Sequence, residues 1–218
     1  MDESEAVGNG YSKIHYCKQR TDEWARLRSG RFTASDFDTL MPAKSKAIDS
    51  WTKTQLDIVH RVAAERLTGQ VSDGGYISAA MQWGIDTENE ARSAYEFETG
   101  KTVQQVGFIE YDEWLGCSPD GLIDDDGGLE LKCPTSAVHL SYLRDQSLFI
   151  NDYKWQCLGS LLVSGRSRWE LISYDPRFPE DKQLVRVIFR YENCLPDLVL
   201  LRNRLDLAIL KVKEIIGG

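Results

Sequence analysis

The chain has 218 residues, of which 42% are hydrophobic and 28% charged, and its formal net charge is −8. This length can bury a sizeable core, so we expect one domain over residues 1–218 with an acidic, flexible start at residues 1–10. That start lacks the features of a signal peptide, and no apolar run could span a bilayer. The five cysteines include no Cys-x-x-Cys pair, which indicates free thiols. We therefore expect neither a secreted nor a membrane protein.

Helical signals dominate the first hundred residues. Thr33-Ala34-Ser35-Asp36 has the pattern of a capping box, and Gly30, Gly69 and Gly100 each follow a segment of helical periodicity and predict its end. Loops are predicted at residues 42–46 and 72–75. The predicted helices span residues 21–28, 33–40, 51–67 and 78–98.

Strand signals take over after Gly100. The cluster Asp124-Asp125-Asp126-Gly127-Gly128 predicts the turn of a β-hairpin. Strands are predicted over residues 103–111, 114–117, 121–123, 129–133, 168–174 and 184–191, with helices over 137–144, 153–162 and 198–216. This order predicts a single α/β domain with a mixed central sheet flanked by helices, rather than an alternating βαβ fold.

The predicted hairpin carries two acids and a lysine. Asp120 precedes one arm and Glu130 lies on the other, and pairing brings the two arms within about 5 Å, close enough for the two acids to share an ion. Glu130 and Lys132 face the same side of their strand, while Leu131 points into the core and can offer its main-chain carbonyl. Such a set can hold Mg²⁺ and activate a water for phosphodiester hydrolysis, with Lys132 deprotonating that water or stabilising the developing charge. An ordinary charged hairpin also fits the pattern, but the strand–turn–strand context favours a nuclease site.

Two further residues are candidates for the same site. Glu88 lies on the predicted helix 78–98 and could be a third carboxylate ligand, although taken alone it fits better an ion pair with Arg92 on a solvated face. Gln156 lies at the start of the helix predicted after the hairpin and could hydrogen-bond a water or a catalytic group. Taken alone, it fits better a surface glutamine.

A second candidate site lies in residues 24–35. Arg28 precedes a glycine turn, and the hydroxyls of Thr33 and Ser35 open a helix, a combination that can bind phosphate. A plain helix cap with a surface arginine fits equally well. The charge distribution allows a DNA-binding role, because residues 86–130 hold thirteen acids and two basic residues whereas residues 13–53 hold nine basic residues and five acids. Solvated faces would give the same counts.

Five motifs in order resemble the phage lambda exonuclease type of viral recombinase, within the PD-(D/E)XK nuclease superfamily. They lie between residues 24 and 177, with spacing near that of the family. The motifs are Trp24-Ala25-Arg26-Leu27-Arg28-x-Gly30-x-x-Thr33-Ala34-Ser35, Trp83-Gly84-x-x-x-Glu88-x-x-Ala91-Arg92, Cys117-Ser118-Pro119-Asp120-Gly121-Leu122, Leu129-Glu130-Leu131-Lys132-Cys133-Pro134 and Tyr174-Asp175-Pro176-Arg177.

The resemblance implies a restriction-endonuclease-like core and a processive 5′→3′ exonuclease on linear double-stranded DNA. Such an enzyme requires Mg²⁺, for which Mn²⁺ is a plausible substitute, and digests the 5′-phosphorylated strand to leave a 3′ overhang. The resemblance also implies a homotrimeric ring around the DNA, a single-strand annealing protein as partner, no membrane, and the cytoplasm of a bacterial or phage-infected cell.

The resemblance further assigns roles to individual residues. Asp120, Glu130 and Glu88 would hold the metal, Lys132 would serve the nucleophilic water, and Met81 would be an apolar wedge that splits the last base pairs, although a methionine on such a helix is more often core. The residues implied to bind the terminal 5′-phosphate are Arg28, Thr33, Ser35 and Ser118. Lys44 and Lys46 occupy the loop in which the family has an arginine, which implies a weaker preference for the phosphate because lysine lacks the bidentate fork.

Three other interpretations stay open. A PD-(D/E)XK endonuclease or resolvase could use the same core, and a closed circular substrate distinguishes it from an enzyme that needs an end. A catalytically inactive DNA-end-binding module is disfavoured by the intact set of Asp120, Glu130 and Lys132. An α/β protein with a chance motif is disfavoured by the phosphate-pocket segment.

Overall fold

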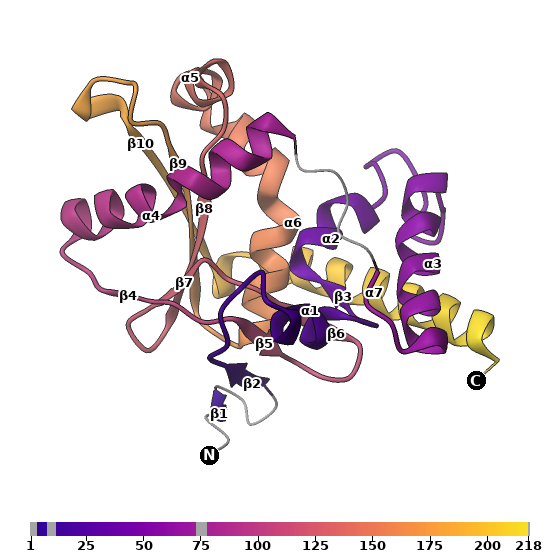
Figure 1. The fold of residues 1–218 in the computed structure, drawn as a ribbon. Helices are drawn as coiled ribbons and strands as arrows, with labels where there is room; N and C mark the ends of the chain where they lie inside the picture. Colours follow the sequence, from indigo (N-terminus) through magenta and orange to yellow (C-terminus); the bar gives the residue numbers. More distant parts are fainter. Residues whose placement is uncertain (1–3, 8–11, 73–77, 218) are drawn as a thin grey trace.

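Within the residues that the structure describes, ten strands form two five-stranded sheets (Figure 1). The structure is a computed structural model that describes residues 4–7, 12–72 and 78–217. In the first sheet all neighbouring strands are antiparallel except β3 and β6. Its strands, in spatial order, are β1 (Ser4–Val7), β2 (Ser12–His15), β5 (Phe108–Glu110), β6 (Leu115–Cys117) and β3 (Phe32–Thr33).

The second sheet carries the predicted hairpin. Its order is β10 (Leu184–Arg190), β9 (Arg168–Tyr174), β8 (Gly127–Lys132), β7 (Gly121–Ile123) and β4 (Val103–Gln104). The β7–β8 hairpin is antiparallel, as its turn predicts, while β8 and β9 are parallel. The mixed sheets with flanking helices confirm the α/β fold class, but the strands expected in one central sheet are divided between two.

Seven α-helices are described, and the predicted glycines end two of them. Gly69 and Gly100 follow α3 and α4 with φ angles of 65° and 67°, a left-handed conformation that glycine adopts without steric cost. None of the described helices is long and apolar enough to cross a membrane. The helices are α1 (Asp22–Arg28), α2 (Ala34–Leu40), α3 (Lys53–Thr68), α4 (Ala79–Thr99), α5 (Ser136–Arg144), α6 (Gln146–Ser164) and α7 (Leu195–Ile216).

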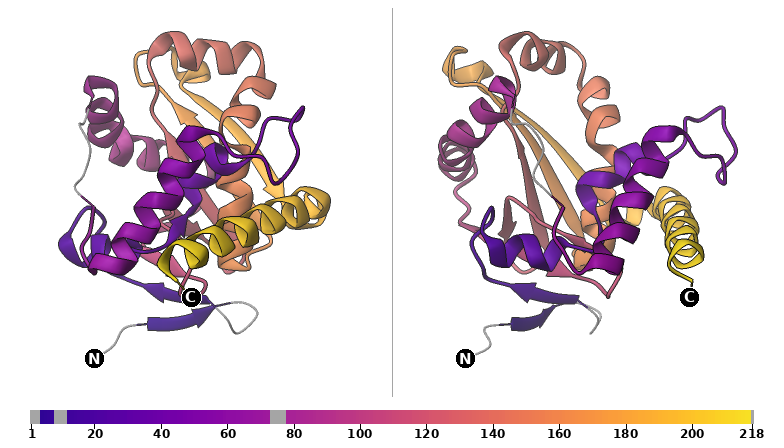
Figure 2. Two further views of the ribbon diagram at one scale, coloured as in Figure 1. Left: turned by 90° about the vertical axis from the view of Figure 1, so that its right-hand side faces the viewer. Right: turned by 45° about the vertical axis from the view of Figure 1, so that its right-hand side comes forward.

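Helix α6 lies at the centre and contacts strands of both sheets. Helices α2, α3 and α7 pack together on its outer side, and α3 and α7 run next to each other (Figure 2). Their apolar faces form the larger core, in which Phe37, Leu158 and Leu201 are completely buried. Helix α4 covers the second sheet instead, and Tyr95 anchors a smaller core there. The two cores fix α2 and α4 relative to the β7–β8 hairpin.

Several element boundaries differ from the prediction. Residues 103–111 form two strands, β4 and β5, because the chain passes from one sheet to the other at Gly107, where a Cβ atom would lie 2.2 Å from the Cys17 carbonyl oxygen. Helix α6 begins seven residues before the predicted start. Within the segment expected to be flexible, residues 4–7 form β1, and the rest of residues 1–10, like most of the loop expected at 72–75, lies outside the described residues.

Candidate active site

Asp120 lies directly before β7 and is tied to the opposite strand. Its N–H donates to the Leu129 carbonyl at 3.1 Å, and its Oδ2 accepts the Leu131 N–H at 2.7 Å. These two contacts place the carboxyl beside β8, which carries Glu130 with a side chain only 5% exposed. The hairpin therefore brings Asp120, Glu130 and Leu131 together, as the sequence predicts, although the observed Leu131 contact uses its N–H.

Glu130, Lys132 and Gln156 form a closed set of hydrogen bonds. Lys132 Nζ donates to Glu130 Oε1 at 2.8 Å and to Gln156 Oε1 at 3.1 Å, and Gln156 Nε2 donates to Glu130 Oε1 at 2.5 Å. The Lys132 ammonium also lies 4.6 Å from the centre of the Tyr153 ring. Gln156 is therefore not a free surface side chain, and its amide bridges the acid and the lysine.

The electrostatics of this cluster suit a cation. Burial, followed by repulsion from Glu130 and Glu88, raises the pKa of Asp120 well above its usual range. Burial would lower the pKa of Lys132, but attraction to Glu130 and Asp120 outweighs it and raises this pKa above its usual value. The closely spaced carboxylates thus favour an added positive charge.

Glu88 lies on α4 within electrostatic reach of Asp120, but both its oxygens are engaged. Arg20 Nη2 donates to Oε2 at 2.9 Å and Arg92 Nη2 donates to Oε1 at 2.8 Å. The Arg92 pair is the i,i+4 contact that the sequence allows. Arg20 has a φ of 66°, which few non-glycine residues adopt. Glu88 is consequently paired with two arginines, although it lies close enough to Asp120 to raise the pKa of that carboxyl.

The donor set fits a hard divalent cation. Among the described residues, no group of three His, Cys, Asp or Glu side chains is arranged as a metal-binding cluster. Mg²⁺ nevertheless needs few protein ligands, because it usually keeps several waters. The hydrogen bonds above involve Oδ2 of Asp120 and Oε1 of Glu130, so the second oxygen of each carboxyl is the atom suited to metal binding.

The four residues implied to bind phosphate converge around one guanidinium. Arg28 Nη1 donates to Ser118 Oγ at 3.0 Å, and its Nη2 donates to Thr33 Oγ1 at 3.1 Å and to Ser35 Oγ at 3.3 Å. Burial lowers the pKa of Arg28, and the nearby Asp36 carboxylate opposes this shift. Three hydroxyls and a desolvated cation thus form a cluster, which we call the Arg28 pocket, with donors suited to a phosphate group.

Two further residues support these sites and were not identified from sequence. Trp24 Nε1 donates to Ser118 Oγ at 2.9 Å, and the Trp24 ring lies 4.6 Å from the Arg28 guanidinium carbon. The i,i+4 spacing of Trp24 and Arg28 could have indicated this stacking. Asp38 on α2 accepts backbone N–H groups from α6 at 2.9 and 3.0 Å. No local sequence signal indicates that contact, because the partners are more than a hundred residues apart.

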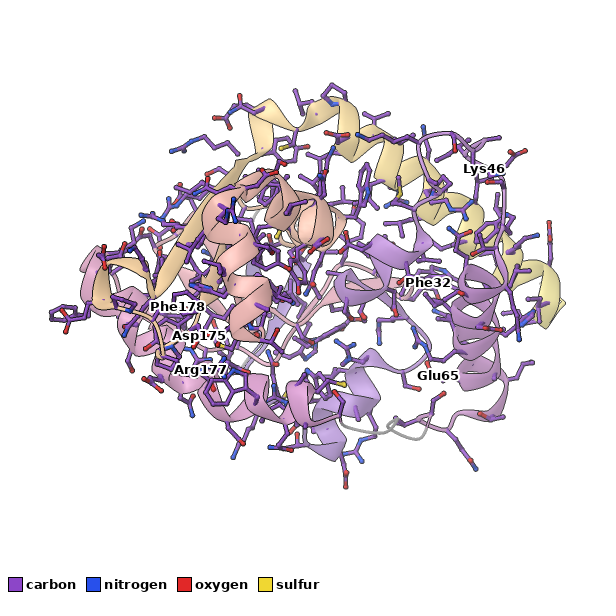
Figure 3. All side chains as sticks on the ribbon, turned by 90° about the horizontal axis from the view of Figure 1, so that it is seen from above. Phe32, Lys46, Glu65, Asp175, Arg177 and Phe178 are labelled. Atoms are coloured by element: carbon purple, nitrogen blue, oxygen red, sulfur yellow. The ribbon has the colours of Figure 1, made fainter. Side chains whose placement is uncertain are left out.

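The structure does not bring Lys44 and Lys46 into the Arg28 pocket. Both are exposed on the α2–α3 loop, and no hydrogen bond or ion pair between described residues joins them to it. Figure 3 shows Lys46 at the outer edge of the molecule, beyond Phe32. Met81 lies in the first turn of α4 with 56% of its surface exposed, so it is not a core residue.

The motif around Arg177 connects α4 to the end of β9. Arg177 donates from Nε and Nη2 to the carboxyl of Asp175 at 2.7 and 2.8 Å, and its guanidinium carbon lies 4.3 Å from the centre of the Trp83 ring. Asp175 is completely buried, and Figure 3 shows it next to Arg177. This contact fixes the start of α4 relative to the second sheet.

Comparison with known proteins places this fold in one class. The profile of the YqaJ-like viral recombinase domain matches residues 23–167. The crystal structure of an alkaline exonuclease (LHK-Exo) from Laribacter hongkongensis is 28% identical, with a TM-score of 0.77 over 90% of this chain and 95% of that one. The same enzyme in complex with dAMP is 27% identical, with a TM-score of 0.76 over the same shares.

A phage-related exonuclease from Haemophilus somnus 129PT shares the fold, with 16% identity and a TM-score of 0.66 over 88% of this chain and 98% of that one. No curated protein sequence matches the chain. The fold is therefore that of the alkaline exonucleases, and the likeness supports a nuclease. The chain belongs to the YqaJ-like viral recombinase family.

Proposed function

We propose that the chain is a metal-dependent 5′→3′ exonuclease that acts on the ends of linear double-stranded DNA. The observation that carries this proposal is the short connection between β6 and β7. Its Ser118 hydroxyl accepts from Arg28 and Trp24, while Asp120, two residues later, lies beside Glu130. A pocket suited to a terminal phosphate thus adjoins a cluster suited to phosphodiester hydrolysis, which favours an enzyme that starts from an end.

The resemblance to the PD-(D/E)XK superfamily gives the hairpin residues their proposed roles. Asp120, Glu130 and the Leu131 carbonyl would hold Mg²⁺, with Mn²⁺ as a plausible substitute, and Glu88 would be a further carboxylate ligand. The bound ion supplies charge neutralisation at the phosphate and a lower pKa for the attacking water. Lys132 donates to that water or to the non-bridging oxygens as negative charge develops. Gln156 fixes the Glu130 carboxylate and the Lys132 ammonium relative to each other.

The Arg28 pocket gives the proposed reaction its direction. A 5′-terminal phosphate accepts from Arg28 and from the hydroxyls of Thr33, Ser35 and Ser118, so the strand that is cut begins in this pocket. Digestion from that end leaves a 3′ single-stranded overhang. Met81 is exposed at the start of α4, where an apolar side chain can part the last base pairs. Lys44 and Lys46 are exposed lysines on the α2–α3 loop. They contribute positive charge to DNA binding, but not the bidentate phosphate contact that an arginine would make.

The remaining proposals rest on the family. A homotrimeric ring would let basic residues line a channel for DNA even though the chain as a whole is acidic. A single-strand annealing protein would receive the overhang during recombination. Digestion of the DNA and transfer of the overhang would take place in the cytoplasm of a bacterial or phage-infected cell.

Digestion of a linear duplex tests this function directly. Duplexes with 5′-phosphate or 5′-hydroxyl ends are incubated with the protein and either Mg²⁺ or a chelator, beside a covalently closed circle of the same sequence. We expect mononucleotides and a 3′ overhang from the phosphorylated linear duplex in Mg²⁺, and no cutting of the circle. Cutting of the circle would identify an endonuclease instead. Binding to the duplex ends without any cutting in Mg²⁺ would identify an end-binding module.

A further inference from the structure

Halfway along α6, two backbone N–H groups donate hydrogen bonds to the carboxylate of Asp38, which lies on α2. Asp38 Oδ1 accepts the Trp155 N–H at 2.9 Å, and Asp38 Oδ2 accepts the Gln156 N–H at 3.0 Å. In a regular α-helix, N–H groups in the interior donate to carbonyls one turn earlier. A carboxylate that accepts two consecutive N–H groups is the arrangement of a helix N-cap. Asp38 therefore caps the second half of α6 from outside.

Close packing fixes Asp38 against this part of α6. Phe37, the preceding residue, is completely buried. Its Cδ2 would lie 2.1 Å from a Cβ atom at Gly159, three residues after Gln156, so a larger residue at position 159 could not allow the same approach. The Phe37–Gly159 contact and the two hydrogen bonds of Asp38 hold α2 and α6 at two points within one helical turn.

The capped residue is the one that bridges the catalytic pair. The backbone N–H of Gln156 donates to Asp38, while its side-chain amide contacts both Glu130 and Lys132 at 2.5 and 3.1 Å. A glutamine side chain has three rotatable bonds, so its reach onto a fixed pair depends on where its backbone lies. Displacement of a catalytic group by about 1 Å can lower a rate by about two orders of magnitude.

The same short helix also forms the Arg28 pocket. Ser35 in its first turn accepts from Arg28, and Asp38 lies three residues later, a spacing that puts both side chains on one face of α2. Thr33 caps the start of the helix and belongs to the same pocket. Helix α2 thus touches the pocket with one end and α6 with the other.

We propose that Asp38 is a positioning residue that holds Gln156 on the Glu130–Lys132 pair and links this hold to the Arg28 pocket through α2. The proposal rests on the exonuclease function above and adds to it a coupling between the two halves of the site. A phosphate bound in the Arg28 pocket restricts the motion of α2, and the hydrogen bonds of Asp38 then fix the position of Gln156. A bound 5′-phosphate therefore raises the maximal rate of cutting as well as the affinity for the DNA end.

A double-mutant cycle tests the first part. Maximal rates and KM are measured on a 5′-phosphorylated linear duplex in Mg²⁺ for the wild type, Asp38→Ala, Gln156→Ala and the double variant. We expect Asp38→Ala to lower kcat about tenfold with little change in KM, and the double variant to be no slower than Gln156→Ala alone. Rate losses that multiply in the double variant would overturn the proposal, because Asp38 would then act independently of Gln156.

Two further variants separate positioning from general damage. Asp38→Asn keeps one acceptor oxygen but turns its NH2 group towards the second backbone N–H, so we expect it to recover only part of the lost rate. Thr39→Ala changes an exposed neighbour on the same helix and should cut at the wild-type rate. Thermal unfolding of each variant shows what fraction is folded at the assay temperature. A rate loss of Asp38→Ala that follows its folded fraction would overturn the proposal.

End chemistry tests the coupling. The ratio of kcat on 5′-phosphate ends to kcat on 5′-hydroxyl ends should exceed one in the wild type and in Thr39→Ala, and should fall towards one in Asp38→Ala. An unchanged ratio in Asp38→Ala would overturn the link through α2. Failure of the wild type to digest either linear duplex would overturn the exonuclease function itself, so the two failures are distinguishable.

Discussion

Ser118 and Asp120 lie two residues apart on one connection, yet their side chains belong to different parts of the site. The Ser118 hydroxyl accepts from Arg28 at 3.0 Å, whereas the Asp120 carboxyl accepts the Leu131 N–H at 2.7 Å. The buried proline between them keeps this segment close to both neighbours. In the proposed function, these three consecutive residues would set the distance from a bound end to the reacting phosphate.

Loss of the Arg28 guanidinium should harm phosphorylated ends most. In Arg28→Ala we expect the affinity for a 5′-phosphorylated duplex to fall by about tenfold or more, because a charge-assisted contact is lost, and the affinity for a 5′-hydroxyl end to fall much less. Competition binding with both ends in Ca²⁺, which prevents cutting, measures this. Arg26→Ala is the matched control, since Arg26 is exposed on the same helix. Equal losses on both ends would contradict the pocket.

Lys132 should be required for cutting but not for binding. We expect Lys132→Ala to abolish digestion, since the ammonium held by Glu130 and Gln156 would be missing where charge develops. DNA binding should persist, because the Arg28 pocket is untouched. Fluorescence anisotropy on an end-labelled duplex measures binding beside the digestion assay. Lys182→Ala, an exposed lysine in the β9–β10 connection, should retain full activity. Full activity of Lys132→Ala would contradict the assigned role.

The hairpin could be predicted because its signals are local. Asp120 and Glu130 flank a turn rich in aspartate and glycine, and the period of two along a strand places Glu130 and Lys132 on the same face. The periodicity of apolar residues likewise predicts the order of the helices and of the strands after Gly100, but it does not predict β1, β2 and β3. These features depend on residues that are close in the sequence.

Contacts between distant segments could not be predicted in the same way. The start of α6 lies seven residues before its predicted position, and the contacts of Asp38 with Trp155 and Gln156 join segments more than a hundred residues apart. The division of residues 103–111 depends on Cys17, about ninety residues earlier in the chain. Such contacts follow from tertiary packing, which a single sequence does not display.

Protonation of Asp38 should make the stability of the protein depend on pH. Burial, opposed by the N–H groups of Trp155 and Gln156, raises the pKa of Asp38 from 3.8 to about 6. The folded protein then binds this proton more tightly than the unfolded chain, so the contribution of Asp38 to stability increases as pH falls from 7 towards 4. We expect a gain of ~1 kcal/mol between pH 7 and pH 5.

Urea unfolding of the wild type and Asp38→Asn at both pH values measures this effect. Asparagine does not titrate, so the variant should lack the part of the pH dependence that Asp38 causes. Other carboxyls, including Asp120, titrate in both proteins and cancel in the comparison. The same pH dependence in both proteins would show that Asp38 has an ordinary pKa.

Two glycines inside helices should respond to alanine in opposite directions. A Cβ at Gly159 would lie 2.1 Å from Phe37 Cδ2, so Gly159→Ala must push α2 away from α6. We expect a loss of about 1–3 kcal/mol in the free energy of unfolding.

A Cβ at Gly84 would approach the Cys133 carbonyl oxygen no closer than 3.9 Å, which is ordinary contact. Gly84→Ala should therefore stabilise α4 by up to about 1 kcal/mol, because alanine has the higher helix propensity. Urea unfolding of both variants measures these changes. A destabilised Gly84→Ala together with an unchanged Gly159→Ala would contradict the close packing of α2 on α6. The position of Asp38 depends on that packing.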